Sequence, residues 1–430
     1  MNAQKYHTII VGSGVGGGTL ARELTKRGKS VLVLERGCRE AKLGTFGDAT
    51  RFYDANPITR IPKKSKEGVI IWRAFMAGGT SVVAMGNITR CLEKEFLDYG
   101  IDLGEEMIEA EKDVSVAPLP DKRLSEGGNR IREAARLIGH TFTNMPKCIE
   151  AERCASCGNC SLGCPNGAKW TALKYLEEAE RLGAEVIYKA HVQRVLQENG
   201  QVSGVAVDLP SGPVEIQAEI VILAAGGVGT PILLQKSGVP QAGEGLFIDL
   251  LQNTYAEVDD FSMMNEPQMA LVDLEYHQER GFLLSTMINH PREVRLIELG
   301  PKGFALPTKR LVGIMTKIVD EPTGKVFADG SISKTVTAAD RQKLDEGARI
   351  SKEILIKAGA SPKSVLTSEI QGAHPGGTAA LGRVVDGNLM AGVKNLYVCD
   401  ASVLPKAPGL PPILNLIALS KHLAKQLAAH

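Results

Sequence analysis

The sequence predicts an α/β fold in which a discontinuous domain, built on a parallel sheet, is joined to a smaller α+β domain. Three observations support this prediction. A glycine-rich turn joins a β-branched run to a helical pattern near the N-terminus. More strand-like runs follow far downstream, between residues 185 and 223, and a region of further candidate strands between about 245 and 345 leads into an amphipathic helix. With 430 residues, the chain has room for two or three folding units.

Composition excludes several classes of partner. Fifty Lys and Arg against 49 Asp and Glu leave a formal charge of +1, which gives no net field to attract nucleic acid or an anionic membrane. Aromatic residues, at 5%, also argue against a base-stacking surface. The chain has no run of about 18 apolar residues and no secretory signal, so we expect no integral membrane segment and a cytoplasmic location.

The glycine-rich turn has the spacing of a Rossmann-like dinucleotide site. A strand-like run over 7–11 precedes Gly12, Gly14 and Gly17, and a second strand-like run ends at Glu35. Gly12 permits the tight turn, Gly14 lets the backbone approach a pyrophosphate, and Gly17 permits close helix packing. The helix N-terminus then faces the phosphates. Because a carboxylate at Glu35 would repel a 2′-phosphate, this site favours FAD or NAD over NADP.

The nucleotide domain is predicted to resume downstream, which favours FAD. Strand-like runs occur at 185–188, 192–196, 204–207 and 220–223. An interrupted nucleotide domain of this kind is typical of two-domain flavoproteins.

Four stretches together resemble the glucose-methanol-choline (GMC) oxidoreductase family, a group of FAD enzymes that oxidise alcohols. The third stretch departs from the family pattern at Gly227 and Pro240, and the fourth is the most specific. The stretches are the fingerprint with Glu35, the glycine-serine loop 78–87, the segment 226–239, and the C-terminal pattern of 374–378 with 395–403 and a terminal helix.

The resemblance implies a set of FAD-binding residues. Asp400 is expected to hydrogen-bond the ribityl chain of FAD, and Val192 to touch the adenine. Pro411-Pro412 is expected to begin the last helix, whose free backbone amides would stabilise negative charge on a reduced flavin. The complete predicted set is Gly12, Gly14, Gly17, Glu35, Arg36, Gly79, Thr80, Ser81, Asn87, Val192, Asp400, Pro412 and Ile413.

His374 matches the position of the family's catalytic histidine, which accepts the substrate hydroxyl proton while hydride goes to the flavin. Its ordinary pKa near neutrality suits this role. The family usually carries a second His or Asn just before the terminal helix, where this sequence has Pro411. Asn415 is therefore predicted as the second catalytic residue, provided that the helix turns its side chain toward the substrate. His290 has no feature that raises it above a surface or sheet position.

Four cysteines, Cys154, Cys157, Cys160 and Cys164, have the C-x₂-C-x₂-C-x₃-C-P spacing of bacterial ferredoxins. This spacing predicts a [4Fe-4S] cluster, with zinc or a metal-free loop as alternatives. Some members of the family carry a similar segment ending in Gly-Cys-Pro-x-Gly-Ala-Lys. The fourth ligand is predicted to be Cys164, and the alternatives are Cys38, Cys91, Cys148 and Cys399.

The predicted cluster shapes the predicted function. A flavin receives two electrons with the hydride, whereas a cluster accepts one electron at a time. FAD would therefore convert the two-electron oxidation of the substrate into one-electron transfers to the cluster. We expect a dehydrogenase of a hydroxyl-bearing organic substrate that passes electrons to a carrier protein or partner subunit. The alternatives are a reductase of a carbonyl or activated C=C bond fed through the cluster, and an electron-transfer subunit without a substrate of its own.

The predicted domains follow these motifs along the chain. FAD-binding segments enclose a cysteine-rich loop and a substrate domain. The predicted boundaries are 1–95 (FAD domain, first part), 96–147 (helical cap or linker), 148–170 (cysteine-rich loop), 171–244 (FAD domain, second part), 245–370 (substrate domain) and 371–430 (FAD domain, C-terminal part).

Overall fold

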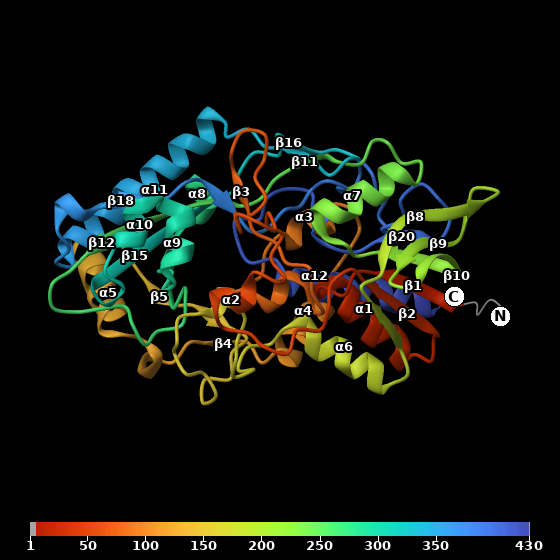
Figure 1. Cartoon of the computed structure of the whole chain (residues 1–430), viewed down its shortest axis with the longest axis horizontal. Helices are drawn as coiled ribbons and strands as arrows, with labels where there is room; N and C mark the ends of the chain where they lie inside the picture. Colours follow the sequence, from red (N-terminus) through yellow and green to blue (C-terminus); the bar gives the residue numbers. More distant parts are fainter. Residues whose placement is uncertain (1–5, 430) are drawn as a thin grey trace.

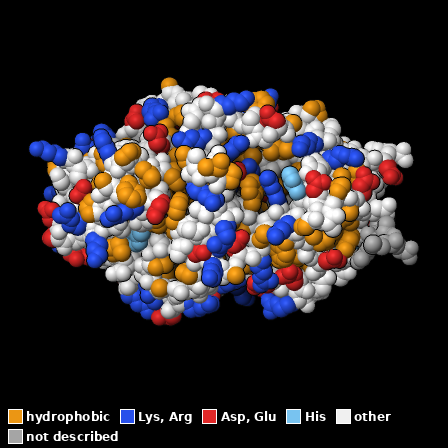
Figure 2. Space-filling model, viewed as in Figure 1, with side chains coloured by type: hydrophobic (Ala, Val, Ile, Leu, Met, Phe, Trp, Pro, Cys, Tyr) orange, Lys and Arg blue, Asp and Glu red, His pale blue; other side chains and the backbone are white. Residues whose placement is uncertain are grey.

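The computed structural model describes residues 6–429 and is built around two large sheets, one toward each end of the molecule (Figure 1). Strands β1, β2 and β8–β10 lie at the end that carries both termini, and β12, β15 and helix α11 lie at the other. Basic and acidic side chains are interspersed over the face shown in Figure 2, in keeping with the formal charge of +1.

The first sheet confirms the predicted discontinuous α/β domain. Strands β7-β2-β1-β10-β20 run parallel, and β10 also continues into an antiparallel meander with β9 and β8. β10 changes partners along its length: 212–217 pair with β9, and 218–223 pair with β1. The strands are β1 (Tyr6–Val11), β2 (Val31–Glu35), β7 (Glu185–Tyr188), β8 (His191–Glu198), β9 (Gln201–Leu209), β10 (Gly212–Leu223) and β20 (Leu396–Val398).

Helices cover this sheet because its central strands are apolar on both faces, as a parallel sheet requires. Helix α1 (Val15–Lys26) packs against α6 (Ala172–Arg181) and α12 (Ile413–Ala428), and α12 packs against α4 (Gly104–Asp113). Helix α7 (Gly226–Lys236) follows β10 and packs against β8.

The second sheet forms the core of the smaller α+β domain. Its order is β3-β19-β12-β15-β14-β13-β5, with β18 also paired to β12. Helix α11 (Ala338–Lys357) packs across β12, β14 and β15. It begins at a capping box, in which the Thr337 hydroxyl and the Asp340 carboxylate each accept a backbone N–H of the other residue. The strands are β3 (Ile70–Ile71), β5 (Thr143–Asn144), β12 (Leu250–Glu257), β13 (Leu271–Asp273), β14 (Phe282–Thr286), β15 (Leu311–Ile318), β18 (Leu366–Thr367) and β19 (Gln371–Gly372).

One strand in the region between about 245 and 345 starts later than its residue pattern indicates. Residues 269–272 read as a strand, but β13 begins at Leu271 because Met269 has a left-handed backbone, with φ at 54°. A strand needs φ well below zero, so Met269 ends the preceding loop instead. Its side chain is buried.

The segment 96–147 is divided between the two sheets: one of its helices packs beside the first sheet, and one of its strands joins the second. Helix α4 packs against α12 beside the first sheet, whereas α5 (Glu126–Leu137) packs against α11 and β5 pairs with β13. The remaining short elements are α2 (Phe46–Ala49), α3 (Glu93–Leu97), α8 (His277–Arg280), α9 (Arg292–Leu299), α10 (Pro301–Ala305), β4 (Ala117–Pro118), β6 (Pro146–Lys147), β11 (Glu244–Leu246), β16 (Gly324–Val326) and β17 (Ile332–Ser333).

Within residues 6–429, no helix is both long enough and apolar enough to span a bilayer.

Candidate active site

A cavity of about 290 Å³ lies at the carboxyl ends of β1, β2 and β10, where parallel sheets of this type bind nucleotides. Eleven of the thirteen residues predicted to bind FAD line it, and His374 lines it as well. The eleven are Gly12, Gly14, Glu35, Arg36, Gly79, Thr80, Ser81, Val192, Asp400, Pro412 and Ile413.

The fingerprint glycines occupy three different environments. Gly12 has φ at +99°, in the left-handed region that favours glycine. A Cβ on Gly14 would meet no atom within 4 Å, because this residue faces the cavity. A Cβ on Gly17 would collide with the Gly12 carbonyl, so Gly17 serves helix packing and does not line the cavity. Gly16, which the spacing rule does not include, is as tightly placed against the Cys399 carbonyl.

Two buried carboxylates at the cavity are held by hydrogen bonds. Glu35 accepts from the Ser13 amide (2.9 Å), the Ser13 hydroxyl (2.6 Å) and the Gly37 amide (2.6 Å). Asp400 accepts from the Gly226 amide (2.8 Å), the Thr230 hydroxyl (2.5 Å) and the Ser402 amide (2.7 Å). Burial raises the pKa of both carboxyls, and these donors oppose the shift.

A second cavity of about 130 Å³ adjoins the first. The two share Thr80, Ala84, Ala373, His374 and Ile413 as lining residues, so they meet at His374 and the start of α12. The walls of the second cavity combine aromatic and methionine side chains with a few buried polar groups. Asn87, predicted to bind the cofactor, lines this second cavity instead of the first.

His374 is oriented by a carboxylate. Its Nδ1 lies 2.8 Å from Oδ2 of Asp249, which is fully buried and also accepts the Gly409 amide at 2.9 Å. This contact assigns the proton to Nδ1 and leaves Nε2 as the free lone pair. Nε2 has no hydrogen-bond partner among residues 6–429. Burial lowers the pKa of His374, as does the charge of Lys317, and Asp249 opposes both.

Asn415 does not lie where the predicted catalytic role requires. Its side chain is fully buried and bonds the backbone of Cys91, accepting from the amide at 3.2 Å and donating to the carbonyl. It lines neither cavity, because the first turn of α12 points it toward the 91 loop. Pro411 does line the second cavity and offers no side-chain hydrogen bond.

The second cavity contains a buried carboxyl group and a buried amino group that sequence reasoning missed. Glu298 accepts hydrogen bonds from four side chains, and burial raises its pKa. Lys317 lines the same cavity, and burial lowers its pKa. The donors to Glu298 are Asn253 Nδ2 (2.9 Å), Asn289 Nδ2 (3.0 Å), Gln371 Nε2 (2.9 Å) and the Tyr255 hydroxyl (2.7 Å).

The four predicted metal ligands, Cys154, Cys157, Cys160 and Cys164, line one small cavity of about 20 Å³. Within residues 6–429, no three of their sulfur atoms lie within 4.8 Å of one another. Two buried lysines lie beside this thiol loop, and neither forms an ion pair with any residue that the structure describes. Lys169 Nζ donates to the carbonyls of Val82 (2.9 Å), Ala84 and Cys160 (3.0 Å), and Lys147 Nζ donates to the carbonyls of Met85 (3.1 Å) and Gln268 (3.0 Å) and to Asn87 Oδ1.

His290 lies against the thiol loop, which the sequence did not indicate. Its Nδ1 is 3.1 Å from the Cys157 carbonyl, and its ring occupies the space that a Cβ on Gly158 would need. Lys169 was visible in the Gly-Cys-Pro-Asn-Gly-Ala-Lys motif, although without a role. No local signal marks His290, because it reaches the loop from a distant part of the chain, and none marks Lys147, which stands shortly before Cys154 in the sequence.

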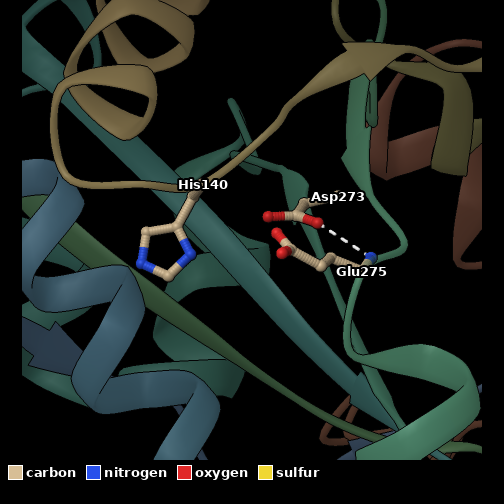
Figure 3. Close-up of side chains that lie close together, drawn as sticks. All are labelled: His140, Asp273 and Glu275. Carbon is tan, nitrogen blue, oxygen red and sulfur yellow. Dashed lines mark hydrogen bonds between the residues drawn. The ribbon is translucent and has the colours of Figure 1, made fainter.

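A separate group of possible metal ligands, His140, Asp273 and Glu275, lies near the end of β13 (Figure 3). Asp273 accepts the Glu275 amide at 2.9 Å, and His140 Nδ1 lies 3.0 Å from the Tyr276 hydroxyl. None of the three lines the cavities that meet at His374. These contacts fix the turn that follows β13.

Comparison with known proteins agrees with this architecture. Family models described as GMC oxidoreductase match residues 1–251 and 321–420. An uncharacterised protein of Methanocaldococcus jannaschii is 31% identical over 98% of this chain and 100% of its own length. A long-chain-alcohol oxidase of Arabidopsis thaliana is 23% identical over 99% of this chain and 68% of its own length.

Solved structures share the fold. Pyridoxine 4-oxidase from Mesorbium loti superposes with a TM-score of 0.75 at 18% identity, covering 99% of both chains. A formate oxidase of Aspergillus oryzae RIB40, from work on its FAD modification, superposes with a TM-score of 0.76 at 16% identity, covering 100% of this chain and 99% of its own. Because the family models match well over half of the chain, the resemblance in the motifs is confirmed: the protein belongs to the GMC oxidoreductases, FAD-dependent enzymes that act on CH–OH groups.

Proposed function

We propose that this protein dehydrogenates a small hydroxyl-bearing compound in the second cavity, with His374 as the proton acceptor, and passes the electrons through a [4Fe-4S] cluster to a carrier protein. The observation that carries the proposal is the meeting of the two cavities at His374, whose Nε2 is free while Asp249 holds Nδ1. A substrate carbinol beside Nε2 would thus lie next to the nucleotide cavity.

The residues of the first cavity fit FAD. The open space beyond Gly14 leaves room for a pyrophosphate, and Glu35 and Asp400 lie where ribose and ribityl hydroxyls would meet acceptors. Bound FAD supplies the acceptor for the hydride that leaves the substrate carbon. The chain itself supplies the base: His374 takes the hydroxyl proton at Nε2, and Asp249 stabilises the imidazolium that forms.

An anaerobic half-reaction tests this role of His374. Mixed with a panel of small alcohols and hydroxy acids, the wild-type holoprotein should lose its oxidised-flavin absorbance. His374→Gln should slow this loss by about 10²- to 10⁴-fold without lowering flavin content. His422→Gln, at a partly buried position on α12 away from both cavities, is the matched control. Equal rates in wild type and His374→Gln would refute the proposal.

The same experiment distinguishes the alternative function. A flavin that no alcohol reduces, but that a carbonyl compound reoxidises, would support the reductase instead.

Charge around the thiol loop supports a metal centre held by four thiolates, which is anionic for a cubane and for a zinc ion alike. Burying two ammonium groups without a carboxylate is costly unless another anion lies nearby. The cysteine sulfurs act electrostatically on both: Cys160 and Cys148 on Lys147, and Cys160 and Cys164 on Lys169. Burial lowers the pKa of Lys147 to about 8, and the cysteine sulfurs oppose this shift. Thiolates that ligate a cubane would supply the missing negative charge.

The choice of a cubane over zinc rests on the spacing of the four cysteines along the sequence, C-x₂-C-x₂-C-x₃-C-P, which is that of bacterial ferredoxins. Cys157 is exposed and the other three cysteines are half-buried, which would leave the cluster within reach of a docked carrier protein.

Metal analysis of anoxically purified protein tests the cluster. We expect one flavin and about four irons per chain, with a paramagnetic signal after reduction by dithionite. Cys160→Ser should lose iron and keep flavin. Cys91→Ser, at a buried thiol outside the loop, should keep both. Stoichiometric zinc, or no metal in the wild type, would refute the cluster.

A further inference from the structure

Lys317 places an ammonium group on the wall of the second cavity. It lies in β15, whose eight residues are all buried, and it pairs with Leu251 of β12. Because side chains alternate along a strand, Met315 and Lys317 face the same side, as do Leu251 and Asn253 opposite them. All four line the cavity.

This amino group has no partner in the part of the chain that the structure describes. Lys317 is only 3% exposed, yet within residues 6–429 its Nζ has no hydrogen bond, and no carboxylate oxygen lies within 4 Å. The nearby Asp249 attracts it, but that carboxylate is already bonded to His374 and the Gly409 amide.

The other buried lysines have partners, in contrast to Lys317. Lys334 is fully buried and forms an ion pair with Asp320 at 2.7 Å. Lys421 contacts Asp113 at 2.9 Å, and Lys147 and Lys169 donate to carbonyl groups. Since an unpaired buried ammonium is costly, an anionic ligand that reaches the Lys317 amino group would stabilise its charged form.

The other polar groups of the cavity narrow the choice of ligand. Glu298 is satisfied by four donors and does not pair with Lys317. Pro411 offers no donor, and His374 Nε2 is the acceptor for a hydroxyl proton. Asn253 Oδ1 is buried and accepts no hydrogen bond from any described residue, so it remains an acceptor for a second hydroxyl. A volume of about 130 Å³ limits the ligand to a few carbon atoms.

We infer that Lys317 binds a carboxylate of the substrate, and hence that the enzyme acts on small hydroxy acids, with the carboxylate at Lys317 and the carbinol at His374. This inference rests on the proposed function and names its substrate class. Lys317 determines specificity; the proton still goes to His374.

The test compares molecules that share a carbon skeleton. Anaerobic flavin reduction by lactate and by 1,2-propanediol is measured in the holoprotein. We expect lactate to be favoured in kcat/KM by about 10- to 100-fold, the worth of one charged hydrogen bond. Lys317→Met, a neutral side chain of similar length, should abolish the preference, and Lys317→Arg should restore part of it. Ile314→Val, on the opposite face of β15 and away from the cavity, should leave it unchanged.

Oxalate supplies a readout that does not depend on turnover. It has no carbinol, so its binding is followed by its perturbation of the oxidised flavin spectrum. We expect oxalate to bind wild type and His374→Gln, and to lose about 10- to 100-fold in affinity in Lys317→Met. Equal binding to Lys317→Met, or no preference for lactate in the wild type, would overturn the inference. If His374→Gln reduced its flavin normally while oxalate binding still required Lys317, the proposed role of His374 would fail and the anion site would stand.

Discussion

The geometry of one residue, Asp249, sets the orientation of the proposed base. Asp249 lies between β11 and β12 with φ at 51°, a left-handed conformation that Asp and Asn adopt more readily than most residues. This turn directs its carboxylate at once to His374 Nδ1 and to the Gly409 amide. The segment before β12 is thereby tied to the loop before α12.

Replacing Asp249 by Asn tests this orientation without straining the backbone, since Asn also tolerates left-handed φ. We expect Asp249→Asn to slow anaerobic flavin reduction by at least about 100-fold, because the amide no longer holds the correct tautomer. The carboxylate raises the pKa of His374, so its removal should move the acidic limb of the rate profile to lower pH. Stopped-flow rates between pH 5 and 8 measure both effects. A limb displaced upward would contradict this account.

At the scale of elements, the β1–α1 turn uses two glycines three positions apart for different purposes. One faces the nucleotide cavity, and the other allows α1 to pack closely on the turn. Gly14 faces the nucleotide cavity with free space beyond its Cα, whereas Gly17 touches the Gly12 carbonyl. The same spacing rule predicted both residues, but the structure separates their roles.

Two alanine variants make this separation measurable. Gly14→Ala should keep the unfolding free energy close to the wild-type value in FAD-free protein and should weaken FAD binding. Gly17→Ala should destabilise the FAD-free protein by about 1–3 kcal/mol, because its Cβ overpacks α1 against the turn. Denaturant unfolding and flavin titration give the two quantities. Equal unfolding free energies for the two variants would contradict the assignment.

The elements also show how far sequence reasoning reaches. The strands around 185–223 and the terminal helix follow local rules of alternation and capping, and the structure has them. The later start of β13 depends on the left-handed φ of Met269, which apolar alternation does not encode. Asn415 had the correct chemistry for the predicted role, but its direction is set by the packing of α12 on the 91 loop.

At the scale of the whole molecule, the features that sequence reasoning missed are contacts between distant segments. Lys317 faces the cavity from the second sheet, and Asp249 reaches His374 across 125 positions of the chain. His290 approaches Cys157 across 133 positions. Each is an ordinary residue in its local context, and only the tertiary arrangement places it beside a motif. The motifs themselves, which are local in sequence, were found.

The thiol loop is joined to the substrate cavity by its own backbone. Ser161 and Leu162, which directly follow Cys160, line that cavity. The Ser161 amide donates to Gln268 Oε1 at 2.8 Å, and its carbonyl accepts the Tyr53 hydroxyl. If these cysteines hold iron, air would therefore damage two things at once. Loss of the metal would remove the electron acceptor and would also disturb one wall of the substrate cavity. Exposure to oxygen would therefore weaken substrate binding as well as electron transfer.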